Sequence, residues 1–387
     1  MTAIVALLLA PFALLTAFFA IEVIAGLRSS FAPAVRAGNA SAVIVIPAHD
    51  EAAVIGDSVR ALLDNLPASV RVLVVAHNCT DETAALARAA GAEVIERTDL
   101  DHRGKGFALA FAADHLKGDA PDVFAVLDAD CRMDSASIRA LADAAASGRP
   151  AQAINLLRPD RTASPLVQIS TFAFMLKNLV RQRGLQRLAG RVHLTGTGMA
   201  MPFGLFQASR KVRSSIVEDL ALGLELADAG HAPMLVQNAT VYSSGSTEKG
   251  TLTQRRRWEG GFIATALRQG PKEILHGLSK ADLRAVSAGL DLMVPPLALF
   301  AFLNAAALAI AALLTVVLGA AWWPVAVQVG LLAIALMAVF AVWLREGRDY
   351  ISFGVLARLP LYVLWKLPMY LGLARRGAPA EWLRTGR

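Results

Sequence analysis

The chain has 387 residues, of which 55% are hydrophobic and only 18% are charged. An ordinary soluble domain carries about 25% charged residues, so this composition excludes a purely soluble protein and predicts membrane segments. The formal net charge of +7 indicates basic residues on the cytoplasmic side of a membrane. Nucleic-acid binding is not expected, because no basic tract alternates with aromatic residues.

The chain contains two cysteines, Cys79 and Cys131, and neither has a spacing typical of a zinc site. Two residues cannot build a disulfide framework, and a reducing compartment suits such a sequence. We therefore expect both thiols to serve as small buried side chains.

The first apolar segment, residues 3–27, is long enough to span a bilayer. A cleaved signal peptide normally begins with basic residues, but here Arg28 and Arg36 follow the segment and none precedes it. We interpret residues 1–28 as a retained transmembrane helix whose C-terminal side lies in the cytoplasm. Glu22 lies inside this span, and we expect it to face protein because a carboxylate facing lipid is costly.

Residues 40–245 have the composition of a folded catalytic domain, and residues 246–286 contain a basic motif and interfacial helices. Two apolar runs, 287–318 and 322–344, then predict two transmembrane helices within residues 287–345. Basic residues flank the pair on both sides, so both flanks should be cytoplasmic: Lys280, Arg284, Arg345 and Arg348.

The C-terminal region 350–387 differs from these spans. Its apolar part, 351–373, contains two prolines and two basic residues and has further basic residues on both sides. A crossing would place the arginine-rich end outside, against the charge rule. We predict an amphipathic or re-entrant helix in the cytoplasmic interface followed by a basic tail, with a third C-terminal crossing as the alternative.

The catalytic region alternates short apolar runs with alanine-rich helical patterns, as in "SAVIVIPAHDE" (41–51) and "VRVLVVAHNCTDETAALARAAGAEVIE" (70–96). This alternation predicts an α/β domain with a mixed, mostly parallel sheet. Ligands bind beyond the carboxyl ends of such strands. Three polar clusters are expected there: His49-Asp50-Glu51, His77-Asn78 and Asp128-Ala129-Asp130.

Several motifs in this region are compatible with chemistry, and each also has a simpler structural reading. Asp128 and Asp130 can face one Mg²⁺ or Mn²⁺ ion together with substrate phosphates, or can be solvated acids at a strand end. Lys105, between two glycines at a helix start, can bind phosphate or simply begin the helix. Glu218 and Asp219 begin another helix, where an acid can act as a general base or cap the helix.

Two further stretches complete the series. "HLTGTGMAMP" (193–202) is a glycine-rich loop that would let a substrate approach the backbone, and "TQRRRW" (253–258) precedes the membrane runs. The order of PAHDE, HNCTD, GKG, DAD, GTG, ED and QRRRW resembles the membrane-embedded branch of the family-2 glycosyltransferases. That branch includes cellulose, chitin and hyaluronan synthases and ceramide glucosyltransferases. The resemblance covers about residues 41–262.

The resemblance implies a GT-A nucleotide-sugar-binding fold, a divalent cation (Mg²⁺ or Mn²⁺) and a role for each matched position. It implies Asp130 as the metal ligand and Asp219 as the general base that deprotonates the acceptor. Donor-binding positions would be Pro47, His49, Asp50, Glu51, His77, Lys105, Asp128 and Arg257. Acceptor-binding positions would be Gly198, Glu218, Gln254 and Trp258.

The chain departs from the family pattern at two places. His77 occupies the position of an Asp that usually accepts a hydrogen bond from uracil, which weakens the expectation of a UDP-sugar, and Val217 replaces a Thr before the acidic pair. Arg255 and Arg256 occupy the unconstrained positions of QxxRW, so we expect them to face lipid.

The expected function is inverting transfer of a sugar, from a UDP-sugar by preference, to a lipid or lipid-linked glycan at the cytoplasmic leaflet. The composition, rich in Ala and Arg, suggests a bacterial inner membrane. The alternatives are a processive polysaccharide synthase, a polyprenyl-phosphate sugar synthase and a catalytically dead carbohydrate-binding scaffold. No nucleic-acid partner is expected, and the sequence does not determine the sugar, the acceptor or the oligomeric state.

Overall fold

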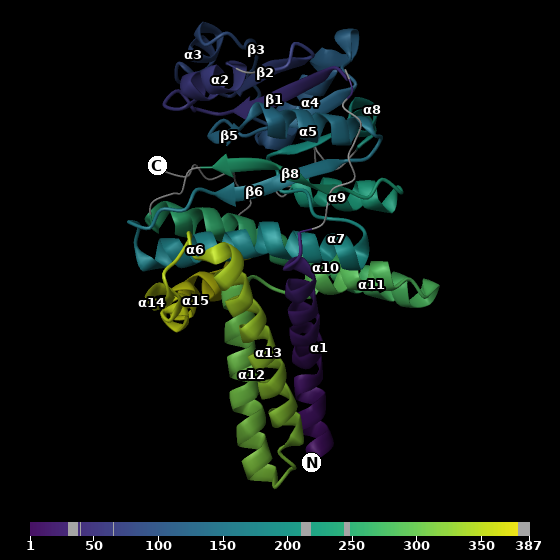
Figure 1. Cartoon of the computed structure of the whole chain (residues 1–387), viewed down its shortest axis with the longest axis vertical. Helices are drawn as coiled ribbons and strands as arrows, with labels where there is room; N and C mark the ends of the chain where they lie inside the picture. Colours follow the sequence, from purple (N-terminus) through teal and green to yellow (C-terminus); the bar gives the residue numbers. More distant parts are fainter. Residues whose placement is uncertain (30–37, 39, 65, 210–217, 244–247, 378–387) are drawn as a thin grey trace.

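The structure is a computed structural model that describes residues 1–29, 38, 40–64, 66–209, 218–243 and 248–377. Figure 1 shows three levels. An α/β domain stands on a layer of helices that lie across its foot, and three long helices extend away from that layer on the other side. The expected basic tail lies largely outside the described residues.

The α/β domain is built on a single sheet of eight strands within the described residues, in the order β3-β2-β1-β4-β7-β6-β8-β5. Four neighbouring pairs are parallel, and β7 and β5 run against their neighbours. The prediction of a mixed, mostly parallel sheet is therefore confirmed. The strands are β1 (Ala42–Ala48), β2 (Val70–His77), β3 (Glu93–Arg97), β4 (Val123–Val126), β5 (Cys131–Met133), β6 (Ala151–Leu157), β7 (Met199–Pro202) and β8 (Met234–Ser243).

Helices cover both faces of this sheet, which explains why its central strands are apolar throughout. In β1, Ile44 and Ile46 join one hydrophobic cluster while Val43 and Val45 join the other, because successive side chains of a strand point to opposite faces. The first cluster packs under α2 (Ile55–Leu63), α3 (Thr83–Ala89) and α5 (Ser135–Ala146). The second packs under α4 (Lys105–His115), which continues into η1 (Leu116–Asp119), α8 (Phe203–Ala208) and α9 (Glu218–Asp228).

The helix layer at the foot of the sheet contains the QRRRW motif. A long helical segment joins α6, a π-helical turn η2 and α7, and it lies beside α10 in Figure 1. Helix α10 carries the motif and is 33 residues long. The members are α6 (Pro165–Met175), η2 (Leu176–Arg181), α7 (Gln182–Ala189), α10 (Glu248–Lys280), α11 (Leu283–Met293), α14 (Phe353–Leu356) and α15 (Leu359–Arg376).

Three helices in the described part of the chain are long and apolar enough to cross a membrane. They are α1 (Thr2–Gly26), α12 (Leu297–Leu318) and α13 (Trp323–Val342), which continues into the π-helical turn η4 (Trp343–Gly347). The expected run 287–318 is divided, because Pro295 and Pro296 separate α11 from α12. The first C-terminal span therefore begins at Leu297, and residues 287–293 belong to the helix layer.

Polar side chains join the three long helices to one another. Thr16 of α1 donates a hydrogen bond to Asn304 Oδ1 of α12 at 3.1 Å, and Gln328 Nε2 of α13 donates to the same oxygen at 2.7 Å. All three side chains are buried. Hydrogen bonds of this kind stabilise helix association in a lipid environment.

A buried chain of charges joins α1 to the helix layer. Glu22 of α1 is completely buried, and its Oε2 lies 2.6 Å from Nε of Arg181. The same guanidinium lies 2.5 Å from Asp291 Oδ1 of α11. Gly26 and Gly184 make this approach possible, because a Cβ on either would overlap a backbone carbonyl of the facing helix. Glu22 thus faces protein, as its position in an apolar span predicts.

We expect Arg181→Met to destabilise the protein by roughly 3–5 kcal/mol, since it would leave the carboxylates of Glu22 and Asp291 buried without a counter-charge. The measurement is thermal unfolding of the full chain in detergent. Arg60→Met is the matched control, because Arg60 and its partner Asp57 are largely exposed. Equal unfolding midpoints for the two variants would contradict the central place of Arg181.

Candidate functional site

The site begins where three neighbouring parallel strands end. β1, β2 and β4 are parallel neighbours, so their carboxyl ends lie at one edge of the sheet. Pro47 is buried inside β1, and His49, Asp50 and Glu51 follow it as half-buried residues. His77 ends β2, and the Asp128-Ala129-Asp130 sequence follows β4 after one residue. This edge therefore collects the three polar clusters expected from the sequence.

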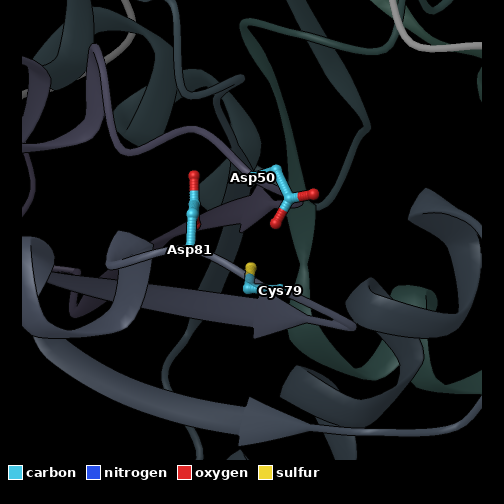
Figure 2. Close-up of side chains that lie close together, drawn as sticks. All are labelled: Asp50, Cys79 and Asp81. Atoms are coloured by element: carbon cyan, nitrogen blue, oxygen red, sulfur yellow. The ribbon is translucent and has the colours of Figure 1, made fainter.

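Asp50, Cys79 and Asp81 form a cluster beyond the ends of β1 and β2, as Figure 2 shows. Asp50 has a φ of 53° and accepts a hydrogen bond from the backbone N–H of Thr80 at 2.7 Å. Asp81 accepts hydrogen bonds from the backbone N–H of Thr83 at 3.0 Å and of Ala52 at 3.1 Å. These bonds hold the two connecting loops together, so both carboxylates already have structural partners.

His77 is almost completely covered, with 1% of its surface exposed. Its Nε2 lies 3.2 Å from the carbonyl oxygen of His102, and Arg97 lies 3.4 Å from both ring nitrogens. Burial and the Arg97 guanidinium lower the pKa of His77, which keeps the ring neutral at pH 7. The expected contact between this ring and a nucleobase would require the ring to be uncovered. His49 donates from Nδ1 to the His77 carbonyl at 2.9 Å and supports the same loop.

Lys105 connects the β4 end to the glycine-rich loop. Gly104 adopts a φ of +127°, which a side chain would disfavour, and Lys105 is the first residue of the helix that follows. The Lys105 ammonium pairs with Asp128 Oδ1 and donates a hydrogen bond to the Gly196 carbonyl at 2.7 Å. A lysine that the sequence suggested for phosphate binding thus lies beside the first acid of the DxD motif.

Asp219 lies beside the same loop, next to Lys105. A Cβ on Gly196 would lie 3.1 Å from Asp219 Oδ2 and 3.5 Å from Lys105 Nζ. Gly196 has a φ of +81°, so this position favours glycine for both its conformation and its space. Thr197 Oγ1 accepts a hydrogen bond from the Asp128 backbone N–H at 3.1 Å. The loop therefore brings the DxD sequence and the acid of α9 to one place.

The surroundings of Asp219 set its protonation. Desolvation raises its pKa, while the Leu220 N–H, Lys105 and Lys177 oppose the rise. Lys177 lies on η2, with Nζ 4.4 Å from the Phe262 ring centre. Part of the Lys177 residue is accessible, while desolvation by the surrounding protein and nearby Arg181 lower the pKa of its ammonium to about 8.

The QRRRW motif occupies the facing helix α10. The Trp258 ring packs against Phe174 with ring centres 5.7 Å apart. The Arg255 guanidinium lies over both rings and donates a hydrogen bond from Nε to Ser170 Oγ at 3.0 Å. Arg255 is buried, so the expectation that it faces lipid is wrong. Its charge is satisfied inside the helix layer instead.

The remaining candidate residues are placed less completely. Arg257 is half-buried in the same turn of α10 as Trp258, and Gly198 has a φ of +62° that places it tightly against Val241. Glu218 begins α9 and Gln254 lies in α10, but their side chains lie outside the described residues. Val217, the departure from the family pattern, lies outside them as well.

Sequence reasoning missed Lys177 and Phe174, which lie three residues apart on the segment facing Trp258. Their spacing is indistinguishable from that of an ordinary buried helix in the sequence. The π-helical turn that carries Lys177 is common at functional sites but has no reliable sequence signal. Another missed contact is that of Lys366 on α15, which pairs with Glu259 beside Trp258 and is 2% exposed.

The residues after β4 fit a hard divalent cation. Ligand atoms of Asp128, Asp130 and Cys131 all lie within 4.8 Å of one another. Cys131 is buried, and desolvation and the neighbouring carboxylates raise its pKa, so its thiol stays protonated. The donor set is then two carboxylates, the set with which Mg²⁺ and Mn²⁺ combine substrate phosphates.

Comparisons with known proteins identify the family and the fold of the chain. Residues 40–261, more than half of the chain, match the family described as glycosyltransferase like family 2. The mannosyltransferase PcManGT from Pyrobaculum calidifontis, solved with GDP-Man and Mn²⁺, has a TM-score of 0.57 at 16% identity over 95% of this chain and 100% of that chain. Glucosyl-3-phosphoglycerate synthase from Mycobacterium tuberculosis, solved with Mn²⁺, UDP and product, has a TM-score of 0.43 at 19% identity over 61% of this chain and 86% of that chain. No curated sequence matches the chain.

We expect Asp130→Ala to weaken Mn²⁺ binding by at least about tenfold, because loss of even an outer partner of a metal site costs that much. Titration of the full chain with Mn²⁺, followed by the electron paramagnetic resonance signal of the free ion, measures the affinity. Asp50→Asn is the control from the other acidic cluster and should bind Mn²⁺ as the parent does. Equal losses of Mn²⁺ affinity in the two variants would contradict a metal site at the DxD sequence.

Proposed function

The chain belongs to the glycosyltransferase like family 2, and from this premise we propose that it transfers a sugar from a nucleoside diphosphate to a membrane-held acceptor with inversion at the anomeric carbon. The single observation that carries the proposal is the meeting of Asp219, Lys105 and Asp128 around Gly196. A base and a phosphate-binding cation lie there at the edge of the sheet where donors bind in α/β folds.

We assign the base to Asp219. Inverting transfer is a single displacement, in which the acceptor oxygen loses its proton as it bonds to the sugar and the nucleotide leaves on the opposite face. Asp219 accepts that proton, and its raised pKa makes it a better base than an ordinary exposed Asp. Gly196 leaves the space in front of the carboxylate that an acceptor hydroxyl needs.

The leaving diphosphate requires positive charge. Lys105 supplies one cation beside the DxD sequence, and Arg257 of the QRRRW motif is assigned the second. Asp128 and Asp130 would hold a divalent cation, which when bound neutralises charge on the diphosphate. Fixed positive groups directed at developing negative charge stabilise the transition state. The nearby structural relative holds GDP-Man and Mn²⁺, so GDP-sugars join UDP-sugars as candidate donors.

The acceptor is assigned to the side of Trp258. Its ring packs against the buried Phe174 ring, and Lys177, three residues further along the same helical segment, acts on the pKa of Asp219. Helices α12 and α1 begin or end in this layer, so a lipid-linked acceptor can reach it from the bilayer. We place the reaction at the cytoplasmic leaflet, with α15 in the interface, and the composition of the chain suggests the inner membrane of a bacterium.

One or few transfers are favoured over polymer export. A channel for a growing glycan needs polar side chains facing its interior. Asn304, which has the amide side chain of α12, is already bonded to Thr16 and Gln328. These contacts tie the three helices together at the level of Asn304, so we place the acceptor at the cytoplasmic end of the bundle.

We expect Asp219→Asn to lower transfer roughly 10²–10⁴-fold, the usual contribution of a general base, while metal-dependent nucleotide binding remains. The full chain in membranes is incubated with labelled UDP-, GDP- and dTDP-sugars, and release of nucleoside diphosphate is measured. The product is then sought in the lipid extract and in insoluble polymer. Transfer at the parent rate by Asp219→Asn would contradict the assignment of Asp219 as the base. Recovery of the product as insoluble polymer would favour a processive synthase.

The rate of transfer should fall as the pH is lowered through the raised pKa of Asp219, because only the ionised carboxylate accepts a proton. Lys177 lowers that pKa by its charge, so Lys177→Met should move the acid limb to higher pH. Lys177→Arg keeps the charge and should leave the limb near that of the parent. A pH–rate profile of nucleotide release measures the pH at which the rate falls on the acid side. The same value for Lys177→Met and the parent would contradict the effect of Lys177 on Asp219.

A further inference from the structure

The loop 193–198 forms one wall of the proposed reaction site, and nearly every residue in it contacts that site or the sheet beneath it. The Thr195 N–H donates to Gln152 Oε1 at 2.9 Å. The Gly196 carbonyl accepts from Lys105, and Thr197 Oγ1 accepts from the Asp128 N–H. A small displacement of this loop would therefore move the partners of both the DxD sequence and Asp219.

The first residue of the loop is fixed from both its backbone and its side chain. The His193 N–H donates to Gln182 Oε1 at 3.0 Å, and Gln182 Nε2 donates to the His193 carbonyl at 2.9 Å. The ring Nε2 lies 2.5 Å from Asp291 Oδ2. Since an ionised carboxylate can only accept, Nε2 carries the proton in this contact.

Asp291 also connects His193, through Arg181, to helix α1. Its other oxygen binds Arg181 NH2 at 2.5 Å, and Arg181 Nε binds Glu22 at 2.6 Å. Glu22 lies one turn before the end of α1, and Asp291 lies shortly before the two prolines that lead into α12. Four polar side chains thus connect the start of the loop to α1 and to α11, the helix that precedes α12.

The helices that carry three of these four side chains pack closely where they meet. Helix α1 touches η2 and α7 backbone to backbone, because Gly26 faces the Val180 carbonyl and Gly184 faces the Glu22 carbonyl. A histidine held by such a frame has a defined position, which is what a group that supports a catalytic constellation requires.

We propose that His193 and Asp291 are positioning residues, which hold the loop 193–198 against the reaction site and make its placement depend on the docking of α1 and α11. This inference rests on the proposed function. His193 touches none of the reacting groups; it acts through Gly196 and Thr197. The acceptor side of the site is then complete only when the membrane helices are seated in the helix layer.

A purely stabilising role is the competing explanation, and it predicts different behaviour. Buried ion pairs are often no more stabilising than well-packed apolar residues, so stability alone gives no reason for a histidine at the start of this loop. If His193 only stabilised the fold, its loss would weaken donor binding and catalysis together. A positioning role instead lowers kcat while donor binding remains.

The test compares His193→Ala with His193→Gln in the full chain, because the glutamine amide N–H can take the place of the ring Nε2–H. We expect His193→Ala to lower kcat for nucleotide release about 10–100-fold, the cost of misplacing groups by about 1 Å, with donor KM and nucleotide affinity within about twofold of the parent. His193→Gln should recover most of the loss. His276→Ala, at an exposed position on α10, is the matched control and should behave as the parent.

Hydrogen exchange gives a second readout that does not depend on catalysis. In His193→Ala the amides of residues 194–198 should exchange faster, while those of β4 should be unchanged. Parent-like kcat, donor affinity falling in parallel with kcat, or unchanged exchange in the loop would each overturn the inference. If the parent released no nucleotide from any donor, the proposed function would fail while the exchange measurement still decided the role of His193.

Discussion

The arrangement of this protein depends on the Arg181 guanidinium, which lies between Glu22 of α1 and Asp291 of α11. A carboxylate buried without a partner is strongly unfavourable, so each of these acids is tied to the one cation that both share. Because the three residues come from three different elements, the pairing fixes how the first long apolar helix, α1, meets the helix layer under the α/β domain. The close backbone contacts at Gly26 and Gly184 leave little freedom for another packing.

The proposed reaction site has two sides, both of which rest on this ion-paired arrangement. The ends of β1, β2 and β4 form one side, where Lys105 and Asp128 meet. Helices α9 and α10 and the turn η2 form the other, with Asp219, Trp258 and Lys177. The glycine-rich loop touches both sides, because Gly196 has no side chain that would separate Lys105 from Asp219. A donor and an acceptor can therefore be bound by different elements and still meet at one point.

We interpret the three long apolar helices as a support for the α/β domain rather than as a channel for a growing glycan. Thr16, Asn304 and Gln328 are hydrogen-bonded to one another between the three long helices, and interhelical hydrogen bonds contribute to helix association in lipid. At the other end, Lys366 of α15 pairs with Glu259, the neighbour of Trp258. Helix α15 is therefore coupled to the helix that carries the QRRRW motif, so a C-terminal segment contributes to the proposed acceptor side of the site.

The sequence by itself determined the class of the protein, the alternation of strands and helices, the three apolar helices and the order of the motifs, because each depends on local composition and spacing. It also placed Glu22 against protein, since a charge in an apolar span leaves few alternatives. Local pattern failed for Arg255, expected to face lipid but buried against Ser170, and for the run 287–318, which two prolines divide. Only the tertiary structure decided that Lys177 would lie beside Asp219 and that Glu22 would meet Arg181, 159 residues away. Such pairs depend on how whole helices pack, so the spacing of neighbouring residues in the sequence does not predict them.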